Sequence, residues 1–325
     1  MKPYEAVART IKGDGAPYTP MYAWVWENVN DKIESKYVSM AAFEDHYEFD
    51  LAHIFDAPPA TYGDAPNPWD EIRAKGIEVT PEVLLEISPW NPPNDMRMYS
   101  HIVKELKHHK ERDRFCYIQT PGIFEHLNGV FGIENHLCYL ALYPNELREV
   151  YRRQAEWNKQ FALNICELGM DMIHVSDDWG SQKSLLFSPK QWWELVYPYH
   201  LITTQAVKKA GKFVSLHSDG NISEVLDGIV SLGYDLIHPY QESAGMSYGA
   251  YLAKYSDKFA ILGGICIQTT LGFGNYGRLE SELRRVFSLL KGKRWCCCTS
   301  HLVQPHCSLE ELEFALDLAH ELCGK

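Results

Sequence analysis

Residues 212–242, KFVSLHSDGNISEVLDGIVSLGYDLIHPYQE, decide the fold class of this chain. The stretch opens with an alternating run that predicts a strand over 212–219, and it closes with a second expected strand over 234–240. Between them lies a segment that ends at Gly233 and has apolar residues at the spacing of one helix face: Ile222, Val225, Leu226, Ile229 and Leu232. Two strands joined by such a helix run parallel, and the helix covers one face of their sheet.

The same alternation of strand and helix continues on both sides of this stretch. A long helix is expected over 145–168, and a capping box formed by Ser308 and Glu311 opens the last helix. Further strands are expected over 115–120, 170–178, 259–265 and 294–301, with weaker candidates over 19–26 and 50–56. Eight strands alternating with helices predict a single (β/α)₈ TIM barrel domain over residues 1–325, with an N-terminal extension. The rival fold, a doubly wound open sheet, usually has a glycine-rich phosphate turn after its first strand, and the sequence has none.

The composition is that of a globular protein, and it narrows the function classes. Of the 325 residues, 46% are hydrophobic and 23% are charged, which leaves ample material for a core. The formal net charge of −12 argues against nucleic acid as a partner, because a phosphate backbone needs basic side chains. We expect neither a membrane span nor a signal peptide, since the sequence has no apolar run of the required kind, and we therefore expect a cytoplasmic protein.

The nine cysteines indicate a reducing compartment rather than a disulfide framework. No CxxC pair is present, so the usual spacing of a zinc site is missing. Cys296, Cys297 and Cys298 are consecutive in an expected strand, where neighbouring side chains point to opposite faces. Three such thiols cannot converge on one metal without distortion, and we interpret them as small core residues.

Polar side chains follow the expected strands at the points where those strands end. In a (β/α)₈ barrel, the carboxyl ends of the strands form the active site. Alternation over 212–219 places His217 and Asp219 on the side that faces the barrel axis, and the same parity turns Asp178 inward. His301 ends the last expected strand. We therefore expect these four side chains to converge.

Two histidines and one carboxylate form a set that suits a divalent metal. Such a set leaves a coordination position open for substrate or water, and zinc is the metal we expect. The residues are His217, Asp219 and His301. Two other interpretations of the same spacing stay open: a catalytic His217–Asp219 couple that works without metal, and a purely structural polar network.

Other polar residues at strand ends have less defined roles. His238 precedes Pro239 and is either a wall residue or a ligand-binding residue. Asp177 and Asp178 are adjacent and could share a proton or hold a donor group of the substrate. We expect one of these two carboxylates to cap a loop instead.

Three aromatic residues alternate in the first expected strand. Tyr22, Trp24 and Trp26 have the same parity, so they lie on one face of that strand. If this face looks into the barrel mouth, the rings could line a pocket for a flat apolar substrate. The alternative is that they fill the bottom of the barrel as packing residues.

Seven runs of the sequence carry a family resemblance: YEAVARTIKGDGAPYTP (4–20), TPGIFEHLNGVFGIEN (120–135), HVSDDWGSQKSLLFSP (174–189), GKFVSLHSDGNISEVL (211–226), GYDLIHPYQESAGM (233–246), ILGGICIQTTL (261–271) and TSHLVQPHCSLEEL (299–312). Together they resemble the uroporphyrinogen decarboxylase superfamily, which includes corrinoid-linked methyltransferases. The resemblance covers most of the chain and implies a (β/α)₈ barrel, in agreement with the periodicity.

The resemblance favours methyl transfer over porphyrinogen decarboxylation. Decarboxylases of the family carry an arginine-rich R-Q-A-G-R-Y segment that binds substrate carboxylates, whereas this chain has MYAWVWENVN (21–30) there. Thiol-methylating members bind zinc through H-x-C and a later cysteine, and the corresponding positions here look like His217, Asp219 and His301. These harder ligands fit a thiol substrate poorly. The pattern is more similar to members that move a methyl group from a small methoxylated or methylated compound to a corrinoid protein.

This resemblance also implies roles for individual residues. The metal, or the His217–Asp219 couple, would act as a Lewis or Brønsted acid on the leaving oxygen or nitrogen. Glu125, Asp178 and Gln241 would orient the substrate beside it. The implied partners are a small-molecule methyl donor and a corrinoid carrier protein, which would bring the corrinoid cofactor.

Two other function classes fit the same residues. The first is a decarboxylase, or another lyase, that acts on a small acid; several arginines in the pocket would favour it. The nearest candidates are Arg73, Arg97, Arg112 and Arg114, and none lies at the end of an expected strand. The second is a binding protein without catalytic activity, which the ionisable groups at the strand ends argue against.

Overall fold

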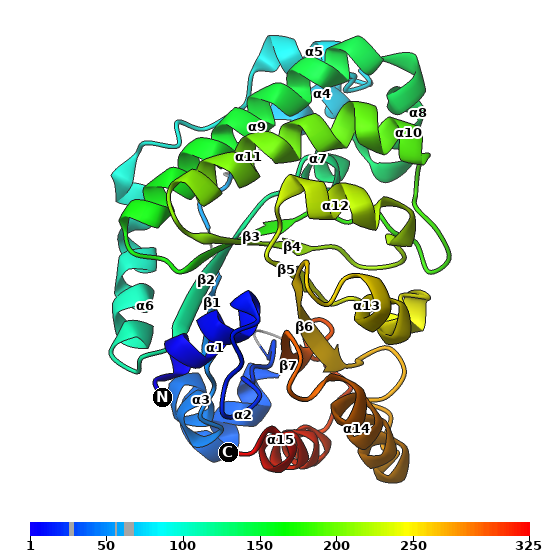
Figure 1. Ribbon diagram of the computed structural model, residues 1–325. Coiled ribbons are helices and arrows are strands. Elements are labelled where there is room, and N and C mark those ends of the chain that lie inside the picture. The colour runs from blue at the N-terminus through cyan, green and yellow to red at the C-terminus, as the bar shows by residue number, and fades with distance from the viewer. Residues whose placement is uncertain (26–28, 56, 62–67) are drawn as a thin grey trace.

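The computed structural model of the chain describes residues 1–25, 29–55, 57–61 and 68–325. Its centre is a parallel sheet in which the strands follow one another in the order of the sequence (Figure 1). The described residues form seven strands: β1 (Leu51–Ile54), β2 (Phe115–Thr120), β3 (Met172–Ser176), β4 (Phe213–His217), β5 (Leu236–His238), β6 (Ala260–Ile265) and β7 (Trp295–Thr299). Each lies within a segment that the sequence predicts as a strand.

The eighth expected strand, over 19–26, is present as a bridged segment and not as a regular strand. Met21 bridges Cys297 of β7 in parallel, and the Tyr22 amide donates to the Cys297 carbonyl at 2.9 Å. On the other side, the Asp50 amide donates to the Met21 carbonyl at 3.0 Å. Further along, the His53 amide donates to the hydroxyl of Tyr22 at 3.3 Å, where a strand partner would offer a carbonyl. The segment therefore lies between β7 and the start of β1 without a continuous ladder. Trp26 and Asp56, at the ends of the two weaker candidate strands, lie outside the described residues.

Helices alternate with the strands, as the sequence predicts. Their bounds are α1 (Pro3–Lys12), α2 (Asn30–Tyr37), α3 (Met40–His46), α4 (Pro68–Ala74), α5 (Pro81–Ile87), α6 (Ser100–Lys110), α7 (Phe124–Phe131), α8 (Ile133–Leu142), α9 (Pro144–Glu167), α10 (Pro189–Gln191), α11 (Tyr197–Lys209), α12 (Leu226–Leu232), α13 (Tyr248–Lys254), α14 (Tyr276–Leu290) and α15 (Leu309–Cys323). Short turns of other helix types lie over 96–99, 192–196, 223–225 and 242–244. None of the described helices has both the length and the apolar character of a membrane span.

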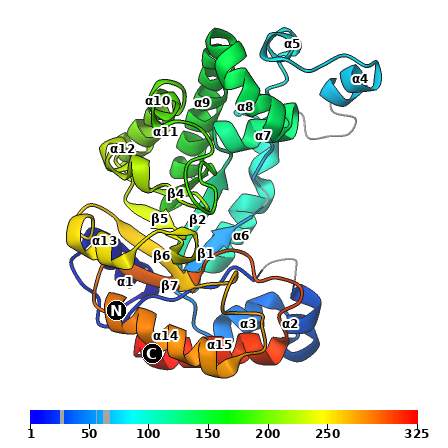
Figure 2. The same cartoon turned by 90° about the vertical axis from the view of Figure 1, so that its right-hand side faces the viewer.

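The helices form a layer outside the sheet. The long helices α9 and α11 contact each other and cover β2, β3 and β4 (Figure 1). In the view turned by 90°, α14 and α15 lie at the opposite end of the molecule from α9, and α4 and α5 extend beyond the barrel (Figure 2). Helix α1 contacts β1, β2, β6 and β7, so the N-terminal extension covers the amino ends of these strands. The carboxyl ends are left for the loops that carry the site.

The interior of the barrel is unusually rich in imidazole rings. His53, His174 and His238 are buried and lie around the ring of Trp24. The Nδ1 atom of His174 lies 2.6 Å from the Ser215 hydroxyl. The three consecutive cysteines of β7 are buried and unbonded, in agreement with their interpretation as core residues.

Candidate active site

A cavity of about 640 Å³ lies at the carboxyl ends of the strands. One wall is built by Ser176 at the end of β3, His217 at the end of β4, and His301 just after β7. Glu125 and His126 of α7 also line the cavity, and the Glu125 carboxyl is hydrogen-bonded to Ser176. An apolar rim follows β1 and consists of Ile54, Phe55, Ala57, Pro58, Pro59 and Ala60. The cavity therefore has a polar end and an apolar end, which is typical of a small-molecule site.

The expected set of two histidines and a carboxylate is brought together by the fold. One potential ligand atom each from His217, Asp219 and His301 lies within 4.8 Å of the others. The Oδ1 atom of Asp219 is buried and has no hydrogen-bond partner among the described residues. A buried carboxylate oxygen without a donor is costly, and a cation held between the three side chains would satisfy it. The residues thus fit a divalent metal at Asp219.

Hydrogen bonds behind His217 determine which of its nitrogens carries the proton. The Nε2 atom of His238 lies 3.0 Å from the carbonyl oxygen of Thr299, which can only accept, so this Nε2 carries a proton. Burial lowers the pKa of His238, and the neutral ring therefore has a lone pair on Nδ1. The Nδ1 atom of His217, at 2.8 Å, must then be the donor. His217 consequently presents the lone pair of Nε2 to the site, as a metal ligand or a base requires.

His301 has the opposite arrangement. The Leu302 amide donates to His301 Nδ1 at 2.8 Å, so a neutral ring carries its proton on Nε2. In this orientation His301 is a hydrogen-bond donor, and it can bind a cation only after its ring turns over. His217 and Asp219 therefore each offer a free ligand atom for a metal, whereas His301 can act as a ligand only after its side chain rotates.

Asp178 lies beside these residues, as the parity of its strand predicts. Its Oδ1 accepts a hydrogen bond from the Asp219 amide at 2.7 Å and lies 3.8 Å from Nε2 of His217. Burial raises the pKa of Asp178, and burial likewise raises the pKa of Asp219. Asp178 thus fixes the loop that follows β4 and contributes charge next to His217.

Asp177 is the member of the aspartate pair that caps a loop. Its side chain points away from the cavity and accepts hydrogen bonds from the amides of Ile123, Phe124 and Glu125 at the start of α7. His200 of α11 donates to the same carboxylate at 2.7 Å. Burial opposes ionisation of Asp177, but the hydrogen bonds that the carboxylate accepts from His200 and from the Glu125 amide act together against it, and the pKa is lowered.

Glu125 is the carboxyl group of the cavity most suited to donate a proton. The hydroxyl of Ser176 donates to its Oε2 at 3.0 Å. Burial, followed by the negative charges of Asp178 and Asp177, raises the pKa of Glu125 to about 8. A carboxyl group with such a pKa is largely protonated at neutral pH and can act as a general acid.

Trp24 lies at the centre of the candidate site. Its ring stacks on His238 at 4.2 Å and on His217 at 5.3 Å between ring centroids, and its Nε1 donates to the Tyr117 hydroxyl at 2.7 Å. Of the aromatic residues predicted on one face of the first strand, Trp24 lines the cavity. Tyr22 lies beside β1 outside the cavity, and Trp26 lies outside the described residues.

Two further strand-end residues lie behind the cavity wall: His238, for which a wall position is one of the two interpretations, and Gln241, expected to orient the substrate. His238 is buried between Trp24 and His217. Gln241 is also buried, and its Oε1 accepts from the Gly220 amide at 3.0 Å, which holds the loop after β4. Their strand-end positions indicate the right region, but neither side chain is among the described residues that line the cavity.

The sequence reasoning missed other residues that line the cavity. Gln119 has the same parity as the inward-facing Tyr117 in β2, and this parity is the signal that could have found it. His126 follows Glu125 in α7, and its Nε2 is buried without a partner among the described residues. No strand periodicity marks His126, because it lies on a helix after the strand.

The fold and site define the class as an α/β protein of TIM-barrel-like kind, with a curled parallel sheet and ionisable side chains gathered at the carboxyl ends of its strands. Within that class, the chain belongs to the uroporphyrinogen decarboxylase (URO-D) family, because the model of that family matches residues 93–322. The family resemblance read from the sequence is thereby confirmed. No curated protein matches the chain significantly in sequence.

Solved structures are similar to this chain, two of them over nearly its whole length and one over part of it. A methyltransferase from Methanosarcina mazei aligns over 99% of this chain and 99% of its own, with a TM-score of 0.72 and 11% identity. A B12-independent methionine synthase from Shewanella sp. W3-18-1 covers 68% of this chain and 66% of its own, with a TM-score of 0.47 and 14% identity. A sugar phosphate isomerase/epimerase from Parabacteroides distasonis covers 95% and 97%, with a TM-score of 0.50 and 9% identity. For the Methanosarcina and Parabacteroides structures, the likeness at these identities is one of fold.

Proposed function

We propose that this protein is an enzyme that transfers a methyl group from a small methoxylated aromatic compound to the corrinoid of a partner protein. One observation carries the proposal: a single cavity holds a carboxyl group suited to proton donation, a free imidazole lone pair and a large aromatic ring. These are Glu125, His217 and Trp24. The donor is then a flat molecule whose ether oxygen lies at the polar end of the cavity.

The residues match what such a transfer requires. The bond between the methyl carbon and the ether oxygen breaks, the methyl group goes to the nucleophilic corrinoid, and the oxygen keeps the electron pair. An alkoxide or phenoxide is a poor leaving group, so the oxygen needs a proton or a Lewis acid. Glu125 can give its proton to that oxygen, and the hydroxyl of Ser176 holds the carboxyl group in place.

His217, Asp219 and His301 would hold a divalent metal, and zinc is the metal we propose. When bound, it would supply Lewis-acid assistance at the leaving oxygen. The chain prepares this position by keeping Nε2 of His217 unprotonated and Oδ1 of Asp219 free of competing donors. Asp178 holds the Asp219 backbone from the far side.

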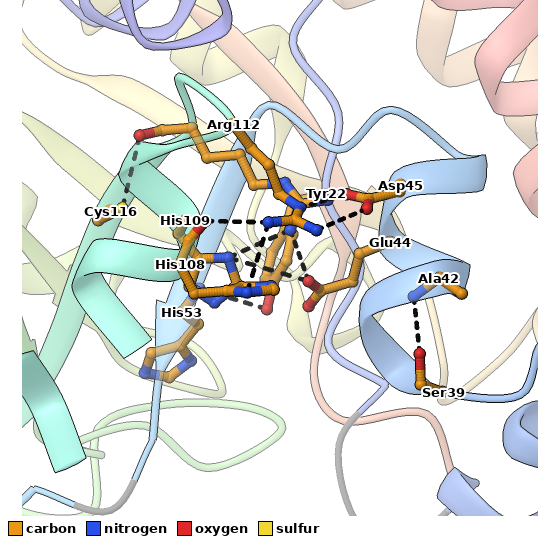
Figure 3. Close-up of polar contacts among 11 residues, drawn as sticks. Tyr22, Ser39, Ala42, Glu44, Asp45, His53, His108, His109, Arg112 and Cys116 are labelled. Carbon is orange, nitrogen blue, oxygen red and sulfur yellow. Dashed lines mark hydrogen bonds and ion pairs between the residues drawn. The ribbon is translucent and has the colours of Figure 1, made fainter. Parts of the chain in front are cut away.

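The charge of the cavity argues against a small carboxylic acid as the substrate. Lys and Arg are absent from its described lining, so a substrate carboxylate would find no counter-charge. Arg112 and Arg114 precede β2, at the opposite end of the barrel. There Arg112 pairs with Asp45, and Arg114 with Glu44 and Asp45 (Figure 3 labels Arg112, Asp45 and Glu44). A decarboxylase of a small acid therefore has less support than the methyltransferase.

The comparisons also support methyl transfer over decarboxylation. The structure that aligns with this chain end to end at a TM-score of 0.72 is a methyltransferase. The match to the uroporphyrinogen decarboxylase family over residues 93–322 supports an enzyme. The corrinoid partner and the aromatic donor go beyond both comparisons and rest on the cavity chemistry and on the sequence resemblance.

The experiment mixes the purified protein with a reduced corrinoid protein and a panel of methyl donors, and follows formation of the methylated corrinoid by absorbance. We expect turnover with methoxylated aromatics, loss of turnover in Glu125→Gln, and normal turnover in Glu134→Gln, which changes an exposed carboxylate on α8. Turnover confined to methylamines or thiols would reject the donor class. Release of CO₂ from a small acid, without methyl transfer, would reject the function.

A further inference from the structure

A buried hydrogen-bond chain runs behind the cavity wall and ends at α7. The hydroxyl of Tyr234 lies 2.7 Å from Nδ1 of His200, and Nε2 of His200 lies 2.7 Å from Oδ2 of Asp177. Asp177 has no exposed surface, and His200 and Tyr234 are at most 2% exposed. Neither Asp177 nor His200 lines the cavity. The methyl-transfer scheme above uses none of these three residues.

This hydrogen-bond chain reaches the cavity through the first turn of α7. The Glu125 amide donates to Oδ1 of Asp177 at 2.6 Å. The Asp177 carboxylate therefore holds the backbone of Glu125, whose side chain lines the cavity. A Cβ atom at Gly122 would come within 2.4 Å of the Asp177 side chain and 2.2 Å of the Ser176 carbonyl. This close approach is possible because residue 122 is glycine. The start of α7 is thus built around Asp177.

We propose that Asp177 and His200 are positioning residues that hold Glu125 in place as the protonated acid of the cavity. The role of Glu125 as an acid rests on the proposed function, whereas its position and protonation can be tested without it. Asp177 accepts from three backbone amides and from His200, and four donors keep this carboxylate ionised. A permanent negative charge beside Glu125 disfavours a second one.

The other ionisable groups around Glu125 do not cancel this effect. Asp178, from the same strand end, adds a second negative charge, and the pKa of Glu125 rises through burial, Asp178 and Asp177 in that order. His126 is next to Glu125, and burial lowers its pKa to about 4, so it is neutral. His217 and His301 line the same cavity, and Asp219 lies beside them. No Lys or Arg is among the described lining residues.

Asp177→Asn separates charge from shape. The amide side chain has nearly the same size, and its oxygen can still accept from the α7 amides. Its NH₂ group can donate to Nε2 of His200, because a neutral imidazole can move its proton to Nδ1. The variant therefore keeps the bonds from the Phe124 and Glu125 amides to the side-chain oxygen, gives up the bond from the Ile123 amide to Oδ2, and removes the negative charge. Tyr151→Phe is the matched control, since Tyr151 makes a similar bond to His136 that ends at the Asn128 side chain of α7.

The readout is the infrared C=O band of the protonated Glu125 carboxyl, identified by its loss in Glu125→Gln and titrated on chelator-treated protein. We expect the titration midpoint to fall by roughly one pH unit in Asp177→Asn and to stay unchanged in Tyr151→Phe. An unchanged midpoint in Asp177→Asn would overturn the proposal. A wild-type protein that transfers no methyl group but shows this shift would reject the proposed function and leave the inference intact.

Should Asp177→Asn fail to fold, two His200 variants decide instead. His200→Gln can still donate to Asp177, whereas His200→Leu cannot. We expect kcat to fall at least roughly tenfold in His200→Leu with KM within about twofold, and to recover in His200→Gln. Equal losses in both variants, or no loss in either, would contradict a positioning role for His200.

Discussion

The Nδ1 atoms of His217 and His238 lie 2.8 Å apart, and the single proton between them belongs to His217. This follows because His238 uses its own proton at Nε2 to reach the Thr299 carbonyl. The reactive nitrogen of His217 is therefore selected by a neighbour that never enters the cavity. Residues of this kind are recognised only when the partners of each ring nitrogen are known.

We expect His238→Phe to weaken metal binding although His238 is not a ligand. Phenylalanine can still stack on Trp24, but it offers no lone pair to Nδ1 of His217, so the ring is free to place its proton on Nε2. Loss of such a supporting hydrogen bond typically costs about 10–100-fold in metal affinity. Zinc affinity by chelator competition, together with ¹⁵N NMR of the imidazoles, measures the effect. His306→Phe, on an exposed loop residue, is the control, and equal affinity in both variants would contradict the tautomer argument.

The purified protein should bind about one equivalent of a divalent metal, zinc by preference. The fit rests on the unpartnered Oδ1 of Asp219 and the free Nε2 of His217. Elemental analysis of protein without an affinity tag tests it, and Asp219→Ala should remove the metal. Asp317→Ala, at an exposed position of α15, should retain it. Full activity in demonstrably metal-free protein would reject the metal role and leave acid–base catalysis as the remaining role of His217.

His217→Ala should abolish most activity and leave the fold intact. A ligand or base is essential to the chemistry, whereas a structural histidine would cost about 1–3 kcal/mol of stability through its unsatisfied partners, with activity following stability. Thermal melting and turnover measured on the same sample separate the two roles. Activity above half of the wild-type value would show that His217 is not part of the site.

Activity should fall as the pH rises through about 8, where Glu125 loses its proton. The same group gives stability a matching pH dependence. Its pKa is raised in the folded protein, so the folded state keeps a proton that the unfolded chain has already released, and this contribution is complete at low pH and lost as the pH rises through about 8. Glu125→Gln should lack this decline. Melting temperatures of both proteins between pH 5 and 9 provide the test; parallel curves would contradict the assignment.

Replacing Trp24 should affect the methyl donor more than the corrinoid partner. Loss of stacking by one ring is worth about 0.5–1.5 kcal/mol, so Trp24→Ala should raise KM for an aromatic donor by about 2–12-fold, while Trp24→Phe keeps most of the contact. Trp193→Ala, at a half-exposed tryptophan outside the cavity, is the control. A KM that is indifferent to Trp24→Ala would mean that this ring is packing only.

Much of the barrel follows from local sequence patterns. The alternation of apolar residues in segments such as 212–219 predicts both a strand and the side of it that faces the axis, because successive strand side chains point to opposite faces. This is why His217, Asp219, Asp178 and His301 could be expected to converge. The first strand is the exception: its residues alternate, but Tyr22 places its hydroxyl where a regular ladder would need a carbonyl.

By itself, then, the sequence determined the order of strands and helices, the parity of the inward-facing residues and the strand ends at which ionisable groups gather, because these depend on periodicities of a few residues. Only the tertiary structure decided which nitrogen of His217 is free, why Asp177 and not Asp178 caps α7, and why Glu125 keeps its proton. Each of those outcomes depends on a hydrogen bond or a charge from a residue far away in the chain: His238 for His217, His200 for Asp177, and Asp178 for Glu125. The protonation state of a side chain is set by its burial and by such neighbours. Neither can be predicted from the periodicity of the sequence.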